Sequence, residues 1–138
     1  MHEFFDHTGD IGVRIRAADP PALFEAAAVA MTDAMTSATV EPRQTDQIAL
    51  EATDLDLLLV DWLSELLYRF ETRAFLVARA HVDLALADGS HQLRATVEGE
   101  PFDARRHPLK VLLKAVTYHA LDIRQHAEGW TATVIFDI

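Results

Sequence analysis

Two aspartates near opposite ends of the sequence stand where carboxylate chemistry could occur. Asp10 follows the turn-forming residues His7-Thr8-Gly9 and begins a stretch of alternating residues, and Asp137 is the last residue but one. In both stretches the aspartate alternates with apolar residues, so its carboxylate is expected on the face of a strand that points away from the core. Directly after Asp137, the main chain ends in the carboxylate of Ile138.

These three carboxylate groups converge if the two stretches are neighbours in a sheet. Three negative charges at close range repel one another unless a cation neutralises them, and hard divalent cations such as Ca²⁺ and Mg²⁺ prefer oxygen ligands. The residues leave a second interpretation open, in which Asp10 caps a turn and Asp137 is an ordinary solvated side chain near a chain end.

Apolar residues at helical spacing predict two long helices. The first covers roughly residues 20–36, with Asp19 as its N-cap, two prolines in its first turn and an apolar stripe made mostly of alanine. The second starts within residues 53–56 and runs to residue 70 with a heavy apolar stripe that should form the main core. We expect Trp62, which lies in this stripe, to pack in the core rather than to bind a ligand.

Alternating residues predict strands, and they continue to the last residue of the chain. A short third helix is expected from His107-Pro108 to Lys114. Because the last stretch keeps its alternation, Phe136 and Ile138 are expected on the core side, and the chain end should be ordered. The predicted strands cover residues 11–17, 48–52, 76–86, 93–97, 117–123 and 130–138.

This order of elements predicts an α+β fold in a single domain that spans residues 1–138. We expect a mixed, mainly antiparallel sheet with two longer helices and one short helix packed on it. Half of the 138 residues are hydrophobic and 25% are charged, which suits one well-packed core and excludes intrinsic disorder.

Several classes of function are excluded by what the sequence lacks. It has no cysteine, which excludes a disulfide scaffold, a cysteine-ligated zinc site and a thiol nucleophile. It has none of the common nucleotide-binding, zinc-protease, serine-hydrolase or EF-hand motifs, and its seven histidines show no metal-ligand spacing. Apolar runs are far shorter than the about 20 residues of a membrane span, and the start is unlike a signal peptide, so we expect a cytoplasmic protein.

The charge balance argues against direct binding of nucleic acid. Twelve Lys and Arg residues against twenty-two Asp and Glu residues give a formal net charge of −10. Proteins that grip nucleic acid by its phosphates normally present a basic surface. We therefore expect no stable binding of RNA by the chain alone, and contact with a basic protein partner if it acts near RNA.

The chain resembles the archease family along nearly its whole length. It departs from the family pattern at Gly9, Ser64 and Leu112, where alanine, asparagine and an acidic residue are common. Each matching segment is weak alone, but together and in this order they are specific. The segments are His7-Thr8-Gly9-Asp10-Ile11-Gly12, Leu58 to Tyr68, Lys114-Ala115-Val116-Thr117-Tyr118-His119, and Trp130 to Ile138.

The resemblance implies a non-catalytic accessory protein. Archeases assist the RtcB-type RNA-splicing ligase, which joins tRNA exon halves with GTP and Mn²⁺, by promoting guanylylation of the ligase histidine and multiple turnover. Family members bind a divalent metal, often Ca²⁺, through residues that correspond to Asp10, Asp137 and Ile138, and Mg²⁺ or Mn²⁺ are alternatives. Lys114, in a family motif, is either a partner contact or part of an ordinary ion pair.

Two other functions stay open at this point. The first is a general chaperone or a modulator of tRNA modification, which would need an exposed apolar patch. The second is a small metal-dependent phosphohydrolase that uses the same carboxylates on its own substrate. A ligation assay with purified components, with and without this protein, separates them.

A C-terminal extension should impair cation binding and ligase activation. Residues added after Ile138 turn its carboxylate into a neutral peptide carbonyl, so one of three anionic groups is lost. Thermal stability without metal should change little, and an N-terminal tag should be better tolerated because nine residues precede Asp10. Equal activity of untagged and C-terminally extended protein would leave Asp10 and Asp137 to carry the site.

Overall fold

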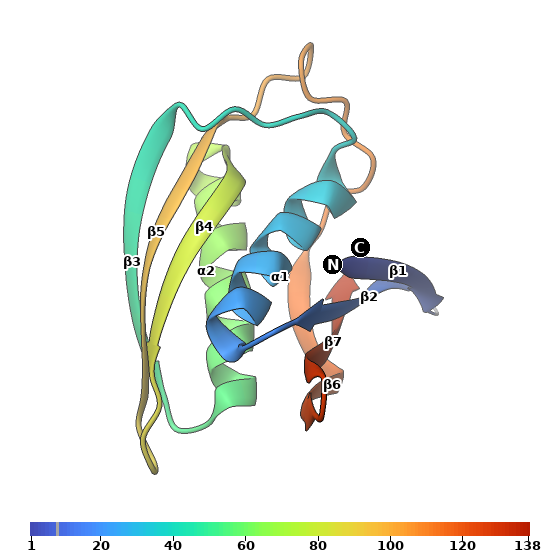
Figure 1. The fold of residues 1–138 in the computed structure, drawn as a ribbon. Helices are drawn as coiled ribbons and strands as arrows, with labels where there is room; N and C mark the ends of the chain where they lie inside the picture. The colour runs from blue at the N-terminus through green and yellow to red at the C-terminus, as the bar shows by residue number, and fades with distance from the viewer. Residues whose placement is uncertain (8) are drawn as a thin grey trace.

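Two antiparallel sheets enclose a layer of two helices, and each helix contacts strands of both sheets (Figure 1). This arrangement is seen in a computed structural model that describes residues 1–7 and 9–138. Thr8, which belongs to the predicted turn before Asp10, lies outside the described residues. The helices are α1 (Pro20–Met35) and α2 (Leu55–Arg73).

The strands form one four-stranded and one three-stranded sheet. The first has the order β1-β2-β7-β6 and the second has the order β3-β5-β4, and every neighbouring pair is antiparallel. The first sheet contains β1 (His2–His7), β2 (Asp10–Ala17), β7 (Gly129–Asp137) and β6 (Ala115–His126). The second contains β3 (Gln44–Ala52), β5 (His91–Pro101) and β4 (Phe75–Ala85).

The α+β class is confirmed, but the expectation of one mixed sheet is wrong. The reason lies in α1, whose buried residues form a band about half of its circumference wide rather than a narrow stripe. A band of this width can contact more than one layer, and α1 packs on strands of both sheets. These buried residues include Leu23, Phe24, Ala27, Ala28, Ala30, Met31, Ala34 and Met35.

Both predicted helix starts are confirmed by their caps. Asp19 accepts a hydrogen bond from the Ala22 N–H at 2.9 Å, and Asp54 accepts one from the Leu57 N–H at 2.8 Å. Trp62 is fully buried, and its indole N–H donates to the Phe24 carbonyl oxygen at 2.9 Å, which joins α2 to α1. Trp62 is therefore a core residue, as predicted.

The first strand of the fold has no counterpart among the predicted elements. Strand β1 lies at an edge of its sheet, where it pairs with β2 alone. Its two phenylalanines, Phe4 and Phe5, are adjacent, so one side chain lies on each face and the sequence shows no alternation of apolar and polar residues. An edge strand with a polar composition gives little periodic signal.

The predicted short helix at residues 107–114 does not form, and this segment is irregular. Its backbone groups bond to distant partners instead of to each other. The Lys110 N–H donates to the Met35 carbonyl oxygen at 2.7 Å, and the Lys114 N–H donates to the Asp137 carbonyl oxygen at 2.8 Å. These tertiary hydrogen bonds replace helical ones and attach the segment to the end of α1 and to the end of β7.

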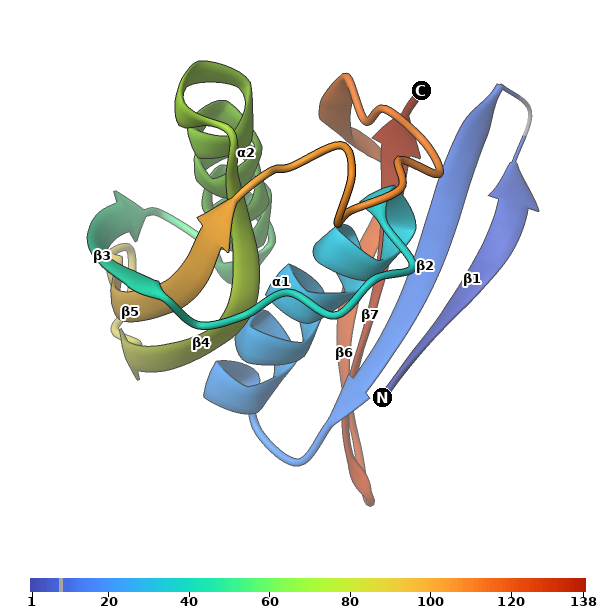
Figure 2. The same cartoon turned by 90° about the horizontal axis from the view of Figure 1, so that it is seen from above.

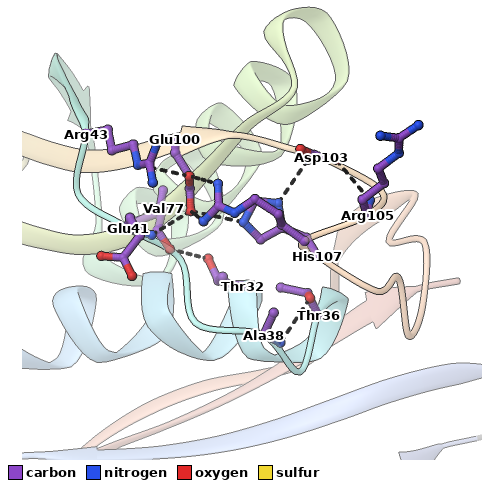
Figure 3. Close-up of polar contacts among 11 residues, drawn as sticks. Thr32, Thr36, Ala38, Glu41, Arg43, Val77, Glu100, Asp103, Arg105 and His107 are labelled. Atoms are coloured by element: carbon purple, nitrogen blue, oxygen red, sulfur yellow. Dashed lines mark hydrogen bonds and ion pairs between the residues drawn. The ribbon is translucent and has the colours of Figure 1, made fainter.

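A buried carboxylate, Glu100 at the end of β5, anchors the start of this segment (Figure 3). Its side chain is 2% exposed and accepts hydrogen bonds from both terminal nitrogens of Arg106 and from the Glu41 N–H. Arg43 lies within 3.6 Å of the same carboxylate. These donors, the Arg106 guanidinium foremost, hold the pKa of Glu100 at about 2 although burial alone would raise it.

His107 completes the anchor from inside the protein. The fully buried imidazole accepts a hydrogen bond from the Asp103 N–H at Nδ1, at 2.9 Å, so its other nitrogen carries the proton. That nitrogen, Nε2, lies 3.0 Å from a Glu100 oxygen and donates to it. The histidine therefore serves the structure, and the loop it fixes leads directly to Lys114.

Within the part of the chain that the structure describes, neither helix combines the length and the apolar character needed to cross a membrane.

Replacing Glu100 by alanine should destabilise the protein by about 3 kcal/mol at neutral pH, because the buried His107 and the guanidinium of Arg106 lose their acceptor. The pKa of Glu100 in the fold, about 2, is below that of an unfolded glutamate, about 4.3. Its contribution is therefore present above the unfolded pKa and is lost as the pH falls toward 2. Urea unfolding at about pH 7 and about pH 3 should show a difference between wild type and variant that shrinks in acid.

Glu98→Ala is the matched control on the same strand. Glu98 is paired with Arg79 at the surface, so this variant should unfold at nearly the same urea concentration as the wild type. Equal destabilisation by the two variants would contradict the anchoring role of Glu100.

Candidate functional site

The register of β2 and β7 places Asp10 directly opposite Asp137. Cross-strand partners in an antiparallel pair put their side chains on the same face, with Cβ atoms about 5 Å apart. Val13 and Ile15 lie on the opposite face of β2 from Asp10 and are buried toward the helices, so the two carboxylates lie on the outer face of the first sheet. The first and the last predicted strands are therefore neighbours, and Asp10 and Asp137 come together as expected. We call these two residues the carboxylate pair.

Repulsion within the carboxylate pair shows in the protonation of Asp137. A hydrogen bond with Asp10 raises the pKa of Asp137, and desolvation and the Asp10 charge raise it further. The nearby Lys114 ammonium acts in the opposite direction and lowers this pKa. A cation bound between the two carboxylates would offset their repulsion.

Lys114 is brought to the carboxylate pair by the irregular segment that precedes β6. Its N–H donates to the Asp137 carbonyl oxygen at 2.8 Å, so its backbone is fixed beside that residue. From the sequence, Lys114 could be linked to a family motif but not to the two aspartates. Lys114 directly precedes Ala115, which pairs with Asp137. This pairing of β6 with β7 brings Lys114 close to the aspartates, and the local sequence pattern does not show it.

Ile138 follows β7 and lies outside the sheet. Its side chain is 42% exposed, so the prediction that it packs on the core side is wrong, whereas Phe136 is fully buried as predicted. The alternation of β7 ends at Asp137 because the strand ends there. As the neighbour of Asp137, Ile138 carries its terminal carboxylate at the same end of the sheet (Figure 2).

The sheet beneath the carboxylate pair is tightly packed on its outer face. Gly12, the next outward position after Asp10, lies directly under the Phe5 ring, where no room is left for a Cβ atom. The Arg14 guanidinium stacks over the Phe5 ring, 4.2 Å from the ring centroid. Ile135 pairs with Gly12 and is fully buried although it lies on this outer face. The backbone that carries Asp10 and Asp137 is therefore held firmly.

The donor set at this end of the sheet fits a hard divalent cation, because it consists of carboxylate oxygens. Among the described residues, no group of three or more His, Cys, Asp or Glu side chains has the arrangement of a metal site. The carboxylate pair and the terminal carboxylate of Ile138 would thus supply only part of the about six to eight oxygens that Ca²⁺ takes. Coordination positions would remain for water or for groups of a second molecule.

Comparisons with known proteins give one consistent result. The sequence profile of the Archease protein family (MTH1598/TM1083) matches residues 2–138. Protein archease of Methanosarcina barkeri is 37% identical over 140 residues, which covers 100% of this chain and 96% of the relative. Protein archease of Pyrococcus furiosus is 34% identical over 138 residues, which covers 99% and 97%.

A solved structure supports the same relationship. The solution structure of Methanobacterium thermoautotrophicum protein 1598 has a TM-score of 0.81 to this chain and 31% sequence identity. The match covers 99% of this chain and 98% of that chain, so the similarity includes both sheets and both helices.

Asp10→Asn should raise the melting temperature in metal-free buffer near neutral pH by about 2 °C, because like charges directly opposite each other in a sheet are destabilising. The pKa of Asp137 is raised in the fold. Its protonated form therefore favours folding at low pH, and this benefit is lost as the pH rises through the folded pKa. The gap between variant and wild type should close when thermal unfolding is measured at about pH 4. A lower melting temperature of Asp10→Asn at neutral pH would contradict repulsion within the pair.

Proposed function

Because the chain belongs to the archease family, we propose that it is a non-catalytic activator of an RtcB-type RNA-splicing ligase. In this role it promotes guanylylation of the ligase histidine and multiple turnover in tRNA splicing or RNA repair. The observation that carries the proposal is the carboxylate pair, two opposed aspartates on the rim of a rigid sheet with Lys114 beside them.

The proposed cation site consists of Asp10, Asp137 and the terminal carboxylate of Ile138. We propose a divalent cation, Ca²⁺ first, with Mg²⁺ and Mn²⁺ as alternatives, since all three prefer oxygen ligands. When bound, the cation supplies positive charge that offsets the repulsion between the carboxylates. The chain itself contributes the fixed spacing of the two aspartates, which β2 and β7 set by their register.

Charge complementarity supports a protein partner. The chain carries a formal net charge of −10, and a ligase that holds RNA and GTP needs a basic cleft. An acidic protein that presents its carboxylates at one end of a sheet can approach such a cleft and help to arrange the groups that react there. The same charge opposes stable binding of RNA by the chain alone.

The proposal is tested with the purified ligase, GTP and Mn²⁺, by measuring guanylylation of the ligase and the number of ligation turnovers. The wild-type chain should increase both. Asp10→Ala and Asp137→Ala should abolish this stimulation even at saturating concentration of the chain, because the proposed site loses one of its few anionic ligands. Higher salt should weaken the complex by screening its charges.

Asp83→Ala serves as the matched control, since Asp83 is an exposed aspartate of β4 in the second sheet. This variant should stimulate the ligase like the wild type. Full stimulation by both Asp10→Ala and Asp137→Ala would exclude the carboxylate pair as the site. No stimulation by the wild-type chain would exclude the proposed function itself.

A further inference from the structure

Strand β6 departs from regular pairing with β7 after Thr117, two residues beyond Ala115, which pairs with Asp137. Between two paired positions it advances from Thr117 to Asp122, while its partner β7 advances only from Ile135 to Thr133. Five steps against two leave three extra residues on β6. They are accommodated in residues 118–121, hereafter the β6 bulge.

The β6 bulge is an unfavourable conformation for the isolated chain. Ala120 has a φ of 56°, in the left-handed region that residues with a Cβ atom rarely adopt. Just before the bulge, the buried hydroxyl of Thr117 has no hydrogen-bond partner among the described residues. Strain of this kind persists where the surrounding structure imposes it, and it is concentrated at sites that bind or switch.

Only one side chain of the β6 bulge packs on the core. Leu121 is partly buried against it, whereas Tyr118 is 63% exposed and Ala120 is exposed as well. Tyrosine is enriched at the centres of protein interfaces, because its ring buries a large area and its hydroxyl tolerates water. An exposed tyrosine on a strained segment therefore fits a contact with another molecule.

The β6 bulge is continuous with the carboxylate pair. Ala115 pairs with Asp137, and Tyr118 follows three residues later, about 10 Å along the strand. Two further exposed apolar side chains, Leu112 and Ile138, flank the same end of the sheet, at 54% and 42% exposure. Carboxylates and exposed apolar side chains therefore lie near the same end of the first sheet.

We propose that the β6 bulge is a recognition element that seats Tyr118 on the ligase surface bordering the cleft that the carboxylate pair approaches. This inference rests on the proposed function and adds to it the residue that anchors the complex. A protein surface fits better than RNA, because the neighbouring carboxylates repel phosphates whereas they attract a basic protein surface.

The experiment compares Tyr118→Ala with Leu86→Ala in the full chain. Leu86 directly follows β4, which belongs to the second sheet, and is 47% exposed, so its removal deletes a similarly exposed apolar side chain outside the first sheet. Binding of the purified ligase and stimulation of its guanylylation are measured against chain concentration. Tyr118→Phe, which keeps the ring, is included as the conservative variant.

Tyr118→Ala should weaken binding to the ligase at least about tenfold while the stimulation at saturating concentration stays unchanged. Tyr118→Phe and Leu86→Ala should bind like the wild type, and all three variants should keep the wild-type melting temperature. The two measurements distinguish Tyr118, which should affect only the affinity for the ligase, from the carboxylate pair, whose loss should remove stimulation.

Wild-type affinity of Tyr118→Ala for the ligase would overturn this inference and leave the proposed function intact. Weaker binding of a tRNA by Tyr118→Ala, with ligase binding unchanged, would overturn it in favour of an RNA contact. Absence of any complex between the wild-type chain and the ligase would overturn both the inference and the proposed function.

Discussion

The antiparallel pairing of β2 with β7 is the constraint on which the rest of the molecule depends. It joins strands from opposite ends of the sequence and places them at the centre of the four-stranded sheet, with β1 and β6 outside them. The inward side chains of this pair, among them Val13, Ile15 and Phe136, pack on the helices and are fully or almost fully buried. The outward side chains of the same pair carry the carboxylates, so one register sets both the core and the site.

The helix layer explains why such a small protein can hold this pairing rigidly. Because α1 and α2 lie between two sheets, each is covered on two sides, and Trp62 ties one helix to the other. The irregular segment after β5 is fixed by Glu100 and His107 rather than by secondary structure. Polar groups buried at one side of the molecule thereby determine where Lys114 lies at the other end of that segment.

Local patterns in the sequence predict the elements that owe their form to local interactions. The apolar stripe of α2 and the cap at Asp54 require no knowledge of the partners they meet, and both are confirmed. The outward position of Asp10 and Asp137 also follows from alternation alone. The sequence predicts that the two aspartates face each other only if β2 and β7 are neighbours, because the pairing and register of strands depend on the whole sheet.

The errors arise where distant contacts override local preference. Residues around Pro108 resemble a helix start, but the Lys110 N–H bonds to Met35, so the helix is lost. Residues 118–121 contain no glycine that would have indicated a left-handed residue, and Ala120 takes that conformation only within the assembled sheet. The roles of Asp10, Asp137 and Ile138 in cation binding stay predictions.

The pairing of β2 with β7 also has a consequence for the order of folding. Strands β4 and β5 form a hairpin, and β3 joins β5 across α2 and β4, so every contact of this sheet lies within residues 44–101. The other sheet needs contacts between residues as distant as Asp10 and Asp137, which carry a larger loop-closure entropy. During synthesis, β2 must therefore wait for the emergence of β7 from the ribosome. The two carboxylates come together only after all the residues between β2 and β7 have been made, so a chain interrupted between these strands cannot present them to a partner.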